Sequence, residues 1–187
     1  MKIDAALNLV IPLQTDNGTV NFHSRPLRRE TFEKYYMVIS MAFTRLIENG
    51  LELTGARVAA MHLKSVAQSI GQWEGAEGVQ KGLFEEIARL TSVLVLTETG
   101  WDSLPVNVAI SREYISEDDW EDAKQGIVFF ILISAMTKGN VRAGFLESLC
   151  SSWEMQTTSL TDTDFAGSLP ILTETVSLPT PTSSVPI

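Results

Sequence analysis

The sequence predicts an α+β fold that is mainly α-helical, with an N-terminal β-hairpin, a compact bundle of about five helices and a flexible C-terminal tail. Three observations support this prediction. Two extended apolar segments flank an Asn-Gly pair at 17–18, and this pair is the strongest short-range signal for a hairpin turn. Apolar residues then recur at helical spacing in several segments. Finally, 12 of the 20 residues from Ser168 to Ile187 are Ser, Thr or Pro, which leaves too few large apolar groups to offset the entropy lost on ordering.

The domain organisation follows from length and composition. One domain is predicted over residues 1–169, followed by the Ser/Thr/Pro-rich tail at 170–187. A domain of about 150 residues buries roughly 70% of the surface of its unfolded chain. The chain is therefore long enough for one substantial core.

The first elements are a hairpin and two helices. The hairpin strands are predicted at 7–13 and 19–22, on either side of the Asn-Gly turn. After Pro26 ends the extended segment, apolar residues at helical spacing predict a long helix over 28–50. A second helix is predicted over 56–70.

The middle of the chain allows two interpretations. The Gly-rich segment 71–82 lacks the glycine order of a nucleotide-binding loop, so an ordinary loop is predicted there. A third helix begins at Val79, but its β-branched continuation at 90–97 is also compatible with a buried strand. Gly100 lies in a short segment that interrupts this pattern.

Three further helices are predicted after this segment. A proline in the first turn favours a short helix at 106–112, and Ser116 is the expected N-cap of the next, whose first turn is acidic. That helix is apolar on every side at 127–133, so it is either central to the core or presents a face to another chain. The last helix is predicted at 141–153 and one further turn at 162–168.

The charge balance argues against nucleic-acid and membrane partners. The net charge is −9 and the isoelectric point is about 4.7, whereas phosphate backbones require clustered basic residues. The sole basic cluster is Arg25, Arg28 and Arg29, interpreted as a solvated helix start, with a phosphate or acidic-partner patch as the alternative. The longest apolar run, at 127–133, is far shorter than the roughly 20 residues that span a bilayer.

No residue pattern indicates catalysis, and the sequence predicts no enzyme activity, no metal and no cofactor. Cys150 is the only cysteine, so an internal disulfide is impossible, which suits a reducing cytoplasm. The only histidines are His23 and His62, and their spacing from each other and from Cys150 matches no metal motif. The N-terminus has no secretion signal.

The order of these features resembles a known family. The segments that carry the resemblance are the hairpin LNLVIPLQTDNGTVNFHSRPL, the helix ETFEKYYMVISMAF, the helix RVAAMHL, the segment EIARLTSVLV with GWDSLPVNVA, and the closing TSLTDTDFAGSLP. Together they cover nearly the whole chain. The sequence resembles the tail assembly chaperones of long-tailed bacteriophages.

The resemblance implies a binding function. A protein of this family would bind the tape measure protein in the host cytoplasm, keep it soluble, assist assembly of tail tube subunits around it, and be absent from the mature virion. A structural virion subunit, such as a head–tail connector or tail-completion protein, is the alternative, and a homo-oligomer is compatible with either. The candidate partner contacts are Trp153, Phe165, Leu169 and Leu172; the alternative for Trp153 and Phe165 is that they cover the domain's own core.

Overall fold

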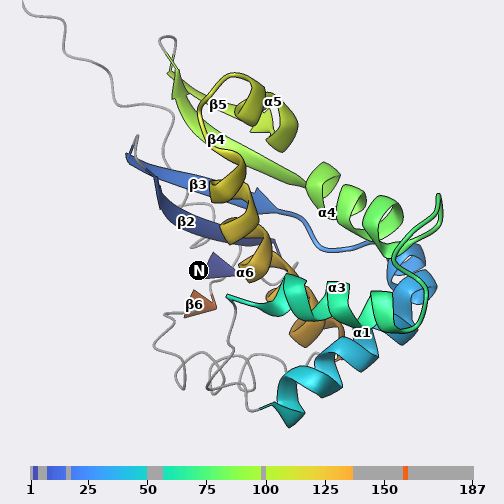
Figure 1. Cartoon of the computed structure of the whole chain (residues 1–187). Helices are drawn as coiled ribbons and strands as arrows, with labels where there is room; N and C mark the ends of the chain where they lie inside the picture. Colours follow the sequence, from blue (N-terminus) through green and yellow to red (C-terminus); the bar gives the residue numbers. More distant parts are fainter. Residues whose placement is uncertain are drawn as a thin grey trace, which may run out of the picture.

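The computed structural model of the chain describes residues 2–3, 8–15, 18–49, 57–97, 100–136 and 158–159. Within these ranges it has an α+β fold, as predicted, with helices packed against an antiparallel sheet (Figure 1). The predicted helix at 141–153, the turn at 162–168 and the tail at 170–187 lie outside the described residues.

The predicted N-terminal hairpin is confirmed. Strands β2 (Leu9–Thr15) and β3 (Gly18–Ser24) pair antiparallel, in a register that runs from Leu9 opposite Ser24 to Thr15 opposite Gly18. Gly18 has a φ of +111°, which a residue without a Cβ adopts at no steric cost. The Asn-Gly signal therefore marks the turn correctly.

A second hairpin completes the antiparallel part of the sheet. Residues 90–97, which the sequence allowed as either helix or strand, contain β4 (Thr91–Thr97). Strand β4 pairs with β5 (Gly100–Pro105), which the sequence did not predict. Strands β3 and β4 join the two hairpins. The short strands β1 (Lys2–Ile3) and β6 (Thr158–Ser159) extend the sheet beyond β2, giving the order β5-β4-β3-β2-β1-β6.

The helices lie close to their predicted positions. They are α1 (Arg29–Glu48), α3 (Ala59–Ser69), the π-helix η1 (Val79–Phe84), which continues into α4 (Glu85–Leu90), α5 (Val106–Ser111) and α6 (Glu117–Met136). The Gly-rich segment predicted as a loop is irregular only as far as Gly78, and its last residues belong to η1. This start of η1 at Val79 matches the predicted third helix. At Gly82 a Cβ would lie 1.6 Å from the hydroxyl oxygen of Tyr35, so the packing of η1 on α1 requires a glycine there.

Helix α6 is the centre of the fold. It crosses the sheet and then packs against both α1 and α3 (Figure 1), and residues 127–133 are all buried. Residues 127–133 therefore belong to the core, and Ile127, Phe130 and Ile131 also line a cavity at its edge. Trp120 links the helical core to the sheet core, since it packs against both and stacks on Phe22 with ring centroids 6.3 Å apart.

The start of α6 is capped as predicted. The Ser116 hydroxyl accepts a hydrogen bond from the Asp119 backbone N–H at 3.0 Å, and Asp119 Oδ2 accepts one from the Ser116 N–H at 2.8 Å. This reciprocal pair is a capping box with Asp in the position usually held by Glu. The acidic run thus opens a helix.

Candidate interaction surface

The described residues include none of the four partner contacts predicted from the sequence. Trp153, Phe165, Leu169 and Leu172 lie outside the described residues, as does Cys150.

Among the described residues, helix α1 carries most of the large apolar side chains that face solvent. Tyr36 is 50% exposed, and Met37 and Ile47 on the same helix are also exposed. Exposed apolar residues that occur singly are normal on a soluble protein. Tyr36 differs because its ring packs edge-to-face on Phe32, with centroids 5.8 Å apart, and Phe32 lines a cavity.

This cavity, which we call the α1–α6 groove, has a volume of about 280 Å³. It lies between the start of α1, the segment that connects β3 to α1, and the second half of α6. Its lining is mostly apolar, and the apolar side chains come from three parts of the chain that are distant in sequence: Leu9, Leu27 with Phe32, and Ile127, Phe130 and Ile131. The groove therefore offers apolar contacts that continue onto the exposed face of α1 through Tyr36.

Two arginines of the basic cluster line this groove. Arg25 and Arg29 both line it. Arg29 Nε lies 2.7 Å from Glu33 Oε1, and the hydrogen bond from Arg29 to this carboxylate raises the pKa of Arg29. Arg25 forms no ion pair with any residue in the described part of the chain.

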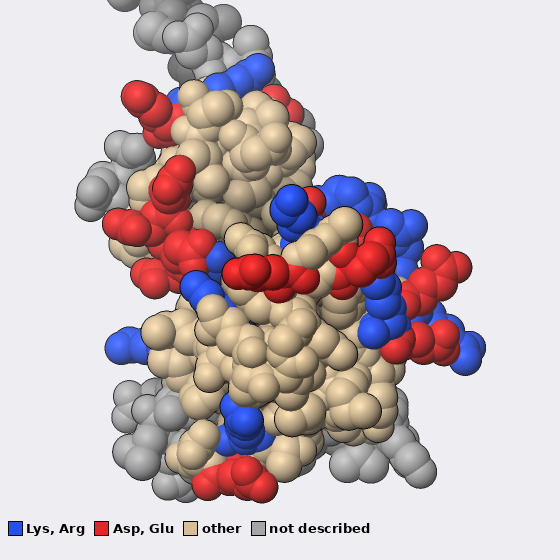
Figure 2. Space-filling model, turned by 45° about the vertical axis from the view of Figure 1, so that its right-hand side comes forward, with Lys and Arg blue, Asp and Glu red and all other residues tan. Residues whose placement is uncertain are grey.

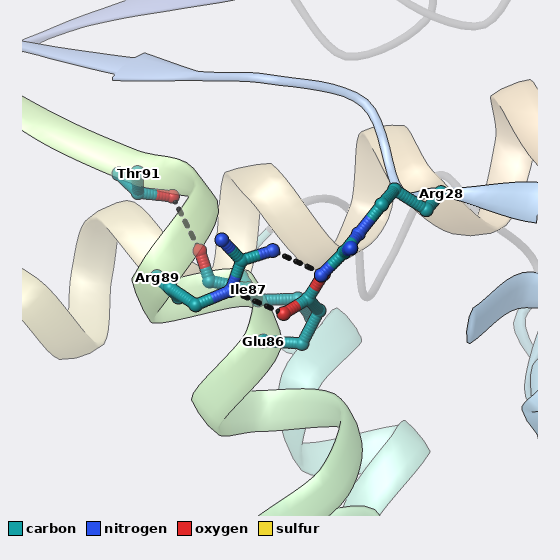
Figure 3. A network of polar contacts seen from close by, with 5 residues as sticks. All are labelled: Arg28, Glu86, Ile87, Arg89 and Thr91. Carbon is teal, nitrogen blue, oxygen red and sulfur yellow. Dashed lines mark hydrogen bonds and ion pairs between the residues drawn. The ribbon is translucent and has the colours of Figure 1, made fainter. Parts of the chain in front are cut away.

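The third arginine of the cluster takes part in a different contact. Arg28 donates to Glu86 Oε1 from both Nε (3.2 Å) and Nη2 (3.1 Å), and Arg89 reaches the same carboxylate with Nε at 2.6 Å (Figure 3). The Arg89 hydrogen bond, first, and that of Arg28 lower the pKa of Glu86, against a raising effect of burial. This network ties the start of α1 to α4, and it engages Arg28 alone among the three arginines of the cluster.

One face of the molecule carries charges of both signs. On the face shown in Figure 2, acidic side chains gather at the upper left, acidic and basic side chains mix at the right, and a broad area without charged residues lies between them. The described residues contain no group of three His, Cys, Asp or Glu side chains placed to hold a metal ion. His23 lies in β3 and His62 in α3, and both are partly buried.

No protein-family model, no curated protein and no solved structure matches this chain. In the part of the chain that the structure describes, no helix has the length and apolar character needed to cross a bilayer. The observations that bear on function are the α1–α6 groove and the charges at its edge.

Proposed function

We propose that this protein is a tail assembly chaperone of a long-tailed bacteriophage. It would bind the tape measure protein, keep that protein soluble and assist assembly of tail tube subunits around it, acting in the host cytoplasm without catalysis and leaving before the virion is complete. The proposal rests on the resemblance in the order of sequence features. The structural observation that supports it is the α1–α6 groove with the exposed ring of Tyr36 beside it.

The groove has properties suited to a helical apolar client. An amphipathic helix presents apolar residues at i, i+3 or i+4, and i+7, and such residues dock into grooves between helices. Each fully buried Leu or Phe contributes about 1.5–3 kcal/mol, whereas association itself costs about 4–15 kcal/mol. A groove that accepts only two or three such side chains therefore gives weak binding, which lets a client be released during assembly.

The test is co-expression with the tape measure protein encoded by the same phage. We expect the client to stay soluble and to co-purify with this chain, and we expect Tyr36→Asp to reduce both. Met61→Asp is the matched control, since Met61 is 63% exposed on α3 and does not line the groove. A client that aggregates in the presence of the unaltered chain would reject the chaperone function.

The alternative, a structural virion subunit, predicts a different distribution of the protein. A subunit persists in purified particles in fixed proportion to the other structural proteins, whereas a chaperone is depleted from them. Quantitative mass spectrometry of purified particles separates the two, and a stoichiometric amount of this chain would favour the subunit.

A further inference from the structure

The two hairpins of the sheet separate at one end. Strands β3 and β4 pair from Ser24 opposite Thr91 to Asn21 opposite Leu94, and the pairing stops there. Both strands nevertheless continue, since β3 begins at Gly18 and β4 ends at Thr97. We call the space between residues 18–20 and 95–97 the hairpin fork.

The hairpin fork is a cleft of about 310 Å³. Its buried side chains are Val20 and Val95, and the partly buried Tyr114 lines it from the turn that follows α5. Leu96, which is 65% exposed, and Trp101 line it as well. The cleft thus combines an apolar interior with an exposed apolar side chain.

The backbone of the fork is suited to a third strand. Continuing the register by two residues would place Thr19 opposite Leu96, but the ladder does not reach them. In antiparallel strands the N–H and C=O groups of every second residue point to the same neighbouring strand. At residues 18–20 of β3 and 95–97 of β4, the strand edges that face each other can therefore pair with an added extended chain, as exposed sheet edges do.

The charge at the edge of the fork favours a bound segment with a basic side chain. Glu113 is the one charged residue among the described residues that line the cleft, and it forms no ion pair with any of them. It also borders a neighbouring pocket together with Asp118 and Asp119. A basic side chain is the complement of this acidic edge.

We propose that the hairpin fork binds an extended segment of another polypeptide by β-strand pairing. The segment would carry an apolar side chain against Leu96, Trp101 and Tyr114, and a Lys or Arg beside Glu113. This site is separate from the α1–α6 groove and does not depend on the chaperone function, because it recognises an extended chain instead of a helix.

The experiment is a titration of the full-length, isotope-labelled protein with an acetylated and amidated pentapeptide, TVKVT, followed by NMR of backbone amides. We expect millimolar peptide to shift amides at 18–20 and 95–97. The same peptide with N-methyl groups on its pairing amides retains the side chains but cannot form the ladder, so it should lose this effect. Shifts of equal size with the methylated peptide, shifts located elsewhere, or no shifts at all would overturn the proposal.

Two matched changes test the ionic contact. Replacing Lys by Glu in the peptide, or Glu113→Asn in the protein, should weaken binding about two- to fivefold, the range for an exposed ion pair. Asn is chosen because it tolerates the positive φ of +60° at position 113. Tyr36→Asp, beside the α1–α6 groove, should leave peptide binding unchanged, and a loss of binding with that variant would contradict the assignment to the fork.

Discussion

The side-chain amide oxygen of Gln125 accepts a hydrogen bond from the backbone N–H of Ala60 at 2.8 Å. Ala60 lies in the first turn of α3, whose N-cap residue, Val58, provides no side-chain cap. Helix α6 thus supplies from a distance the acceptor that the sequence around Val58 lacks. The same contact explains why a glutamine is buried in the core-facing part of α6.

Removing this acceptor should destabilise the fold. Gln125→Met keeps the length of the side chain but leaves the Ala60 N–H without a partner in the core, at a cost of about 1–3 kcal/mol. Urea denaturation should show a lower midpoint at an unchanged slope. Gln68→Met, on the exposed face of α3, is the control and should stay within about 0.5 kcal/mol of the parent; equal effects of the two substitutions would contradict the role of Gln125.

The contact between Tyr35 and Gly82 gives a second prediction. Tyr35 donates its hydroxyl hydrogen to the Glu77 carbonyl at 3.1 Å, in a space that a Cβ at position 82 would fill. Gly82→Ala should therefore destabilise the protein by about 1–3 kcal/mol, the usual cost of overpacking. Tyr35→Phe removes the clashing oxygen, so the double variant should lose less stability than the sum of the two single variants. Strict additivity in a double-mutant cycle would show that the two residues do not interfere.

The Arg28–Glu86–Arg89 network should make stability depend on pH. The pKa of Glu86 is lowered in the folded protein, so its carboxylate stabilises the fold above the unfolded pKa of about 4.3 and loses that effect as the pH falls through the folded value. Glu86→Gln should cost about 0.2–1 kcal/mol for each of the two ion pairs at pH 7. The difference from the parent should shrink below about pH 5. Thermal unfolding from pH 7 to pH 3 measures this, with the exposed neighbour Glu85→Gln as a control that should show a smaller difference at pH 7.

Local signals in the sequence predicted local structure well. Gly18 marks the hairpin turn and Ser116 caps α6, because each residue acts within a few positions of its own place in the chain. Strand β5 was missed because Trp101, Asp102, Ser103 and Pro105 do not alternate between apolar and polar. The β-branched run before Gly100 was the signal that could have suggested a second hairpin.

The two candidate sites could not be predicted from the sequence, because each is formed by residues from distant parts of the chain. The α1–α6 groove takes residues from β2, from the segment after β3, and from α1 and α6, so no window of sequence contains it. The hairpin fork depends on where the pairing of β3 and β4 ends. Periodicity shows which residues are apolar, but it does not show which of them stay exposed after distant elements pack together.

The backbone at Glu113 provides the last prediction. Glu113 is the one non-glycine residue with a positive φ in the described part of the chain, a conformation that costs an L-residue about 1–2 kcal/mol. Glu113→Gly removes this strain but adds about 0.5–1 kcal/mol of backbone entropy to be lost on folding, so the variant should gain about 0–1.5 kcal/mol. The adjacent Arg112 has a φ of −97°, and Arg112→Gly should lose stability because it adds entropy and relieves no strain. Chemical denaturation of the two variants measures the difference, and a loss at position 113 as large as that at position 112 would show that the turn stores no strain.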